Sequence, residues 1–183
     1  MPNYCSNDLF IQGNKQSISK LKEELFTTKD DEIELTFNRI VPMPKGYIES
    51  GEWYDWSWEN WGTKWDAFET YVVDEGNKEE INVSFTTAWS PPLPFLYALA
   101  NKYPDVTIEC HFIETGFEIC GSFYSDEMGV REQEEEMVYV NDNGDLLVME
   151  SNGDEPIYKY ANTGEIYEQD ENDSLFGYHP QMI

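Results

Sequence analysis

The sequence predicts an α+β fold in which one antiparallel sheet carries two helices on one face. Several segments alternate apolar and polar residues as strands do, and two others repeat apolar residues at helical spacing. An aromatic insertion, residues 42–65, holds five of the six tryptophans. An acidic β-meander is expected from residue 126 onward. We therefore divide the chain into a domain, residues 1–125, which includes the insertion, and an appendage with a tail, residues 126–183.

The chain begins with a predicted strand–helix–strand unit. Residues 4–12 form the first strand, whose apolar face consists of Cys5, Leu9 and Ile11. Ser17 is a candidate N-cap for the helix, and Asp30-Asp31 ends the unit's helical part. The apolar positions of the helix are Ile18, Leu21 and Leu25, with Lys20 and Glu24 as an exposed pair. Residues 33–37 alternate again and predict the second strand.

The aromatic insertion follows a loop rich in proline and glycine, residues 41–52. Tyr54, Trp58, Trp61 and Trp65 have the spacing of one helical face, and Gly62 is a plausible end for the helix. A buried tryptophan contributes at most about 4–6 kcal/mol. Helical aromatic spacing favours a core role for these rings. The alternative is an aromatic platform for a ligand or partner, because tryptophan is enriched at binding hot spots.

Two further strands and a second helix are predicted next. Residues 65–73 and 81–86 are strand-like, and Ser90 is a candidate cap for a helix that starts with Pro91-Pro92. The expected buried face of that helix consists of Leu93, Leu96, Tyr97 and Ala100. Residues 106–112 form the next strand, which leads into a hairpin.

The register of that hairpin depends on its loop. A two-residue loop at Thr115-Gly116 opposes apolar residues to one another; its pairs are Glu114 with Phe117, Phe112 with Ile119, Cys110 with Gly121 and Ile108 with Phe123. A three-residue loop would instead oppose Cys110 to Cys120, but it would pair Phe112 with Glu118. We predict the first register and therefore no disulfide between these cysteines.

The charge of the chain is extreme, at −26 for 183 residues. Residues 126–183 carry 16 of the 37 acidic side chains and 2 of the 11 basic ones. Turn signals at Asn143-Gly144, Asn152-Gly153 and Thr163-Gly164 predict the meander, with a weak repeat of residues 139–146 in residues 160–166 and a loose tail from Asp170. Such a chain repels nucleic acid and anionic membranes, and attracts basic surfaces.

Several classes of protein are disfavoured by composition. No apolar run is long enough for a membrane span, and the N-terminus does not resemble a signal peptide, so we expect a cytoplasmic protein. Three cysteines and two distant histidines supply no recognisable zinc or iron–sulfur ligand set. His111 is expected at the surface, and residues 141–145 resemble a calcium loop but fail the EF-hand spacing. We therefore predict no catalytic residue, no metal and no cofactor.

Four separated motifs point to a family: residues 1–7, residues 38–44, Glu59-Asn-Trp-Gly-Thr-Lys-Trp-Asp-Ala67 and Thr86-Thr-Ala-Trp-Ser-Pro-Pro-Leu-Pro94. Together they resemble the YubB-type ferredoxin-like domain family, encoded mostly by bacteriophages and conjugative plasmids. The resemblance covers roughly residues 1–125 and implies a ferredoxin-like α+β sandwich. It implies no activity, because the family has none established, and no functional residue is transferred.

These observations favour a non-catalytic, acidic binding protein of a mobile element in a bacterial host cell. We expect a basic protein partner, such as a nucleic-acid-handling or defence protein, rather than nucleic acid or membrane. The alternatives are an enzyme with a carboxylate site near the tryptophans, and a structural or assembly protein. The candidate partner-binding residues are Glu132, Glu134, Glu135, Glu136, Trp53 and Trp56.

Overall fold

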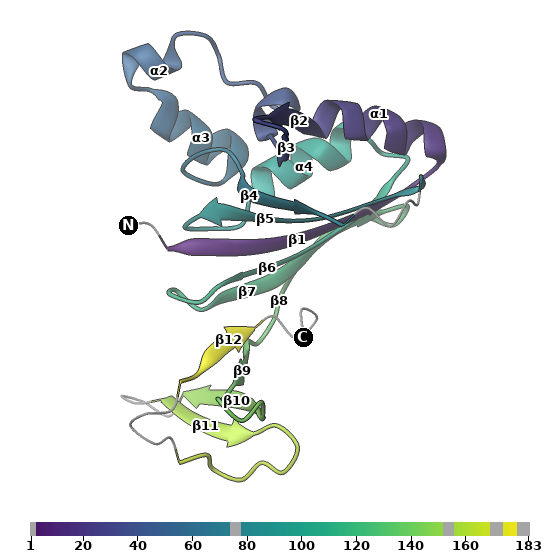
Figure 1. The fold of residues 1–183 in the computed structure, drawn as a ribbon. Coiled ribbons are helices and arrows are strands. Elements are labelled where there is room, and N and C mark those ends of the chain that lie inside the picture. Colours follow the sequence, from purple (N-terminus) through teal and green to yellow (C-terminus); the bar gives the residue numbers. More distant parts are fainter. Residues whose placement is uncertain (1–2, 74–77, 152–155, 169–173, 179–183) are drawn as a thin grey trace.

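A six-stranded antiparallel sheet dominates the computed structural model, which describes residues 3–73, 78–151, 156–168 and 174–178 (Figure 1). Its strand order is β4-β5-β1-β6-β7-β8. The strands are β1 (Tyr4–Gln12), β4 (Phe68–Val72), β5 (Glu80–Ala88), β6 (Thr107–Glu114), β7 (Ile119–Asp126) and β8 (Gly129–Glu134). Helices α1 (Lys15–Leu25) and α4 (Leu93–Lys102) lie on one face. The order β1-α1-β4-β5-α4-β6 is that of a ferredoxin-like fold, which confirms the predicted class.

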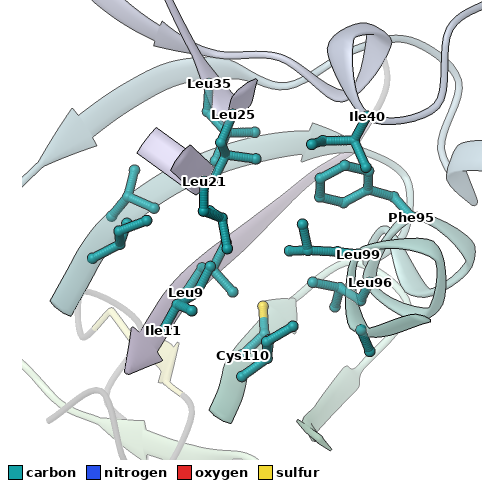
Figure 2. Close-up of a cluster of buried hydrophobic side chains, with 14 of the residues drawn as sticks. Leu9, Ile11, Leu21, Leu25, Leu35, Ile40, Phe95, Leu96, Leu99 and Cys110 are labelled. Carbon is teal, nitrogen blue, oxygen red and sulfur yellow. The ribbon is translucent and has the colours of Figure 1, made fainter. Parts of the chain in front are cut away.

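The main core lies between this sheet and its helices (Figure 2). Strand β1 alternates as predicted, and its buried apolar side chains are Cys5, Leu9 and Ile11. Asn7 shares that face, and its amide is satisfied because Nδ2 donates to the Cys5 carbonyl at 3.0 Å. The helices supply the opposite wall with Ile18, Leu21, Leu25, Phe95, Leu96 and Leu99.

Helix α1 begins before its predicted cap. Its N-cap is Asn14, whose Oδ1 accepts the backbone N–H groups of Gln16 and Ser17, each at 3.0 Å. The Ser17 hydroxyl instead donates to Asp105 on the loop before β6. The prediction of Ser17 as the cap is therefore wrong, because an asparagine three residues earlier caps equally well. The expected pair of Lys20 and Glu24 is present at 3.9 Å.

The predicted second strand does not join the main sheet. Residues 26–35 form a separate hairpin of β2 (Phe26–Lys29) and β3 (Glu32–Leu35). Asp30 and Asp31 make its two-residue turn with φ of 50° and 66°, a conformation that aspartate tolerates. The chain then turns through a 3₁₀ helix, Phe37–Arg39, and β4 takes the place beside β5.

The β6–β7 hairpin differs from the predicted register by two residues. Glu114 pairs with Ile119 and Phe112 with Gly121, so the loop has four residues. The buried carboxylate of Glu114 stabilises that loop by accepting the N–H groups of Gly116 and Phe117, each at 2.8 Å. A shift of two preserves which side chains share a face, so alternation could not distinguish the two registers.

Helix α4 also departs from its predicted boundary and face. It begins at Leu93 after Pro92, and the Ser90 hydroxyl donates to the Gly62 carbonyl instead of capping the helix. Its buried residues are Phe95, Leu96, Leu99 and Ala100, whereas Tyr97 is 40% exposed. Leu96 and Ala100 are buried as predicted, while Phe95 and Leu99 take the buried places that were expected for Leu93 and Tyr97.

The acidic region contributes strands to two different sheets. Strand β8 extends the main sheet, and a second sheet lies on the side away from the helices (Figure 1). Its strands are β9 (Val138–Val140), β10 (Leu146–Ser151), β11 (Pro156–Tyr160) and β12 (Phe176–Tyr178). A second core joins the sheets through Ile113, Cys120, Met137, Tyr139, Leu147 and Tyr167.

The predicted turns and tail of this region lie partly within the described residues. The Asn143-Gly144 and Thr163-Gly164 turns are present, with positive φ at both glycines. Asn152-Gly153 lies outside the described residues. The tail from Asp170 is partly outside them too, but residues 176–178 pair with β9 as β12, so that segment is not loose.

The predicted absence of a disulfide between Cys110 and Cys120 agrees with the structure. These two cysteines lie in different cores, and all three cysteines are buried thiols.

Candidate functional site

The aromatic insertion folds as two short helices, α2 (Tyr47–Ser50) and α3 (Trp53–Trp61). Gly62 ends α3 as predicted, with φ of 79° and an N–H that donates to the carbonyls of Ser57 and Trp58. A Cβ at this position would lie 2.4 Å from Cδ of Pro94. Gly62 therefore ends the helix and also permits the close contact between α3 and α4.

One indole ring forms part of the main core. All six tryptophans lie in the described residues, and of these Trp61 alone is buried, with 4% exposure. Its ring packs against Phe37 and Trp56, with centroid distances of 6.1 and 5.2 Å. Its Nε1–H donates to the Val41 carbonyl at 2.9 Å. This satisfied, buried indole anchors the insertion to the sheet.

The predicted helical face is wrong for Tyr54 and Trp65, whereas Trp58 is half-buried. Tyr54 is 43% exposed, and Trp65 lies beyond the end of α3, so neither shares a buried face with Trp61. The inward position between them is Ser57, whose hydroxyl bonds to the carbonyls of Tyr54 and Lys64. A small side chain, whose single O–H lies within hydrogen-bond distance of two backbone carbonyls, thus shares the buried side of α3 with Trp61.

Three of the tryptophans border an open groove of about 800 Å³, which we call the tryptophan groove. Trp53, Trp61 and Trp65 line it, together with Met43 and Ile48. Ile48 is 76% exposed, and Trp53 is half-buried. Trp56, the other candidate tryptophan, packs instead against the main core. The groove therefore includes one of the two predicted tryptophans and adds two that the prediction omitted.

Charged groups of both signs border this groove. Lys45, Lys64, Glu49 and Asp66 line it. The ammonium of Lys64 lies 4.8 Å from the centroid of the Trp65 ring, so one ring face already holds a cation. Glu52, at the N-cap of α3, and Asp55 and Glu59, on α3, are exposed at helical spacing, but they are not among the residues that line the groove. Glu49 and Asp66 are therefore the carboxylates at the groove itself.

Asp66 is the carboxylate held most rigidly in this groove. Oδ1 accepts N–H groups of Phe37 and Ala67 at 2.6 and 2.9 Å. Oδ2 accepts the Thr36 hydroxyl at 2.7 Å and the Asn38 N–H at 3.4 Å. Burial raises the pKa of this carboxyl, and the hydrogen bonds oppose that shift. Four bonds use as many lone-pair sites as a carboxylate has, so Asp66 fixes the 3₁₀ turn rather than receiving a substrate proton.

The four glutamates of the predicted acidic site do not form one surface. Glu132 and Glu134 lie on β8, opposite Phe123 and Gly121 of β7. Glu135 points to the other face, where it accepts the Ser122 hydroxyl, and Glu136 is exposed. Strand β8 and strand β4 are opposite edges of the main sheet, and the tryptophan groove adjoins the β4 side. The glutamate run and the tryptophans are therefore separate.

A polar cluster centred on His111 was not predicted. Its Nε2 lies 2.8 Å from Glu109 Oε1, and its Nδ1 lies 2.8 Å from the Ser122 hydroxyl. The side chain of His111 is 13% exposed, so the expectation of a surface histidine is wrong. Ser122 is fully buried and also bonds to Glu135, so the cluster links β6 and β7 to the segment that follows β8. The correct hairpin register would have revealed it, because His111 pairs with Ser122.

Two negative findings hold for the residues that the structure describes. Within those residues, no group of three or more histidine, cysteine or acidic side chains is placed to hold a metal ion. Across the same part of the chain, no helix has both the length and the apolar character needed to cross a membrane.

Comparisons with known proteins give one match. A family model described as a ferredoxin-like domain in Api92-like protein matches residues 60–161. The match extends past residue 125, into β9, β10 and β11. No curated protein and no solved structure matches the chain.

Proposed function

The chain belongs to the family of ferredoxin-like domains in Api92-like proteins, and on this premise we propose that it is a non-catalytic, acidic protein-binding module. The observation that carries the proposal is the tryptophan groove, whose lining includes the exposed carboxylate of Glu49. Tryptophans at a concave surface are among the residues that most often dominate binding energy. The proposed ligand is an arginine or lysine side chain of a basic protein partner.

The internal contact of Lys64 with Trp65 supports a cationic ligand. A cation over an indole ring contributes about 0.5–1 kcal/mol when exposed and about 2 kcal/mol when desolvated. Arginine stacks on such rings better than lysine because its guanidinium is planar and more weakly hydrated. Glu49 lines the same groove and offers a carboxylate to the same guanidinium.

The overall charge of −26 supports a basic partner at longer range. Two unit charges about 10 Å apart in water interact by only about 0.4 kcal/mol, so many carboxylates must act together. Their main effect is expected on the association rate, and salt should reduce it steeply. The glutamates of β8 would contribute to this field, while the tryptophan groove would supply the contact.

The resemblance to YubB-type domains supports a more specific proposal. The protein would be encoded by a phage or plasmid and would act in the cytoplasm of its bacterial host. Its partner would be a basic host or defence protein that handles nucleic acid, with carboxylates in the place of phosphates. Direct binding to nucleic acid is not proposed, because the charge repels it.

The alternative of an enzyme has one specific candidate, Asp66, whose pKa is raised in the groove. Its four hydrogen bonds favour a structural role, as argued above. An assembly role in a virus particle is the other alternative, and proteomics of purified virions would distinguish it from a protein that acts in the host cell.

Tryptophan fluorescence titrated with an arginine-rich peptide tests the proposal. We expect saturable binding that weakens about tenfold or more in Trp53→Ala, as for a hot-spot residue, and falls steeply between about 0.05 and 1 M NaCl. The matched control is Tyr71→Ala, which removes an aromatic side chain of 69% exposure outside the groove. Binding that is unchanged by Trp53→Ala would exclude the groove as the binding site. Binding that is unchanged at high salt would exclude the electrostatic contribution.

A further inference from the structure

A second cavity, of about 420 Å³, lies where α1 ends and the β2–β3 hairpin begins. It exists because residues 26–35 fold as their own hairpin, which lies beside β4 without pairing with it in the main sheet. The backbone N–H of Leu35 donates to the Thr70 hydroxyl at 3.0 Å and fixes the hairpin against β4. We call this cavity the hairpin pocket.

The hairpin pocket has an apolar floor and wall. Phe26, Ile33, Val72 and Ile81 line it. Ile81 is 2% exposed and belongs to the main core, so the floor is rigid. Ile33 on the hairpin is 51% exposed, which leaves an apolar wall in contact with water. An apolar group placed between these side chains would remove that surface from water.

Two cations converge on the same pocket. Lys22, on the last turn of α1, and Arg39, on the 3₁₀ turn, both line it. Arg39 Nη1 donates to the Phe26 carbonyl at 2.5 Å, and this bond holds the guanidinium at the pocket. Neither side chain lies within ion-pair distance of a carboxylate in the described part of the chain.

The local charge of this pocket is opposite to that of the protein. The chain has 37 acidic and 11 basic side chains, yet two of the basic ones meet here. Glu80 is the carboxylate among the lining residues, and the hydroxyls of Thr27 and Thr28 add two uncharged donors. Distant carboxylates are screened at physiological salt, where the Debye length is about 8 Å.

We propose that the hairpin pocket binds a small organic anion: a carboxylate or phosphate group attached to an apolar body the size of an aromatic ring. The Arg39 guanidinium has further N–H groups of suitable geometry for such an oxyanion, and Lys22 adds a point charge. The apolar body lies between Ile33 and Ile81. This site takes an anion, whereas the tryptophan groove takes a cation, so the two proposals are independent.

Two-dimensional ¹H–¹⁵N NMR titrations of the full chain test this proposal. The probes are phenyl phosphate and benzoate, with inorganic phosphate as the head group alone and benzylamine as the body with reversed charge. We expect saturable shifts from one or both aryl anions, centred on Lys22, Ile33 and Ile81. Inorganic phosphate and benzylamine should leave those resonances unchanged. Absence of saturable shifts with both aryl anions, equal shifts with benzylamine, or shifts confined to the tryptophan groove would overturn the proposal.

Charge variants add a test of the assigned residues. Lys22→Met is expected to weaken binding of the aryl anion about tenfold, as for loss of a hydrogen bond to a charged group. The control Lys15→Met removes the same charge from an exposed position on the same helix and should change affinity by less than about twofold. Equal losses in both variants would indicate non-specific attraction and refute the site.

Glu80→Gln gives a result of opposite sign, which is useful if Lys22→Met does not fold. Removing the carboxylate that opposes the ligand should strengthen binding about threefold. Unchanged or weaker binding in a folded Glu80→Gln protein would contradict the assigned position of the anion. Circular dichroism of each variant establishes that the fold is retained.

Discussion

Replacing Trp61 with alanine is expected to lower the free energy of unfolding by about 4 kcal/mol. The ring is 4% exposed, and a buried tryptophan removes about 200 Å² from water, which gives about 5 kcal/mol at 25 cal/mol per Å² as an upper bound. Measured truncations of buried aromatic residues cost about 3–5 kcal/mol because the cavity collapses only in part. The substitution also leaves the Val41 carbonyl without its indole donor.

Urea unfolding followed by far-ultraviolet circular dichroism measures this loss without depending on indole fluorescence. Trp53→Ala is the matched control, since it removes the same side chain from a half-buried position in the same helix. We expect it to cost less than about 1.5 kcal/mol. Trp61→Phe should be intermediate, because it keeps an aromatic contact with Phe37 but loses the hydrogen bond.

The relative costs decide whether the rings of α3 have separate roles. If Trp61→Ala and Trp53→Ala cost the same within about 0.5 kcal/mol, our assignment of one ring to the core and the other to the groove is wrong. If Trp53→Ala unfolds the protein, its effect on peptide binding cannot be interpreted as loss of a contact. The expected result, a stable Trp53→Ala protein with weakened binding, separates folding from function.

Three further results are expected. Gly62→Ala should cost about 2 kcal/mol or more in urea unfolding, because φ is 79° and a neighbouring side chain lies 2.4 Å from the new Cβ, whereas Gly51→Ala at φ 83° has open space and should cost only the backbone part, about 1 kcal/mol. Burial raises the pKa of Asp66, so the native state retains the proton of this carboxyl to higher pH than the unfolded state does. Relative to Asp66→Asn, the free energy of unfolding of the wild type should therefore increase as the pH falls through that raised pKa towards 3.8. A decrease over the same range would contradict the raised pKa. Burial raises the pKa of Cys5 to about 12 and that of Cys120 to about 11, so a disulfide reagent at pH 8 should modify both slowly in the native protein and rapidly in denaturant.

Local patterns predicted the elements whose neighbours lie close in sequence. Strand β1 and helix α1 have one apolar face each, and burial follows those faces closely. The helix end at Gly62 follows from a local requirement for positive φ. The pairing of β6 with β7 was not predictable in the same way, because registers that differ by two residues bury the same side chains.

The functional surfaces were less predictable, because both depend on tertiary placement. Helical spacing alone put Trp65 on the face of a helix that ends four residues before it. The tryptophan groove requires residues 43–49 to fold back beside α3, and no local pattern specifies this. Likewise, Lys22 and Arg39 are 17 positions apart, and they meet because the intervening residues form a hairpin. The Asp30-Asp31 pair is a detectable signal for a two-residue hairpin turn, although from the sequence alone it indicates only where the first helical unit ends.

Both cavities lie where this chain departs from a regular ferredoxin-like fold. A regular fold passes directly from the first helix to an edge strand, whereas here residues 26–67 form a hairpin, a 3₁₀ turn and two short helices before β4. The added segment cannot enter the sheet, so it packs on the helix side and encloses the hairpin pocket and the tryptophan groove. The family model matches residues 60–161, and Lys22, Arg39 and Trp53 all precede that region. The proposed binding sites therefore depend on this added segment, most of which lies outside the matched region.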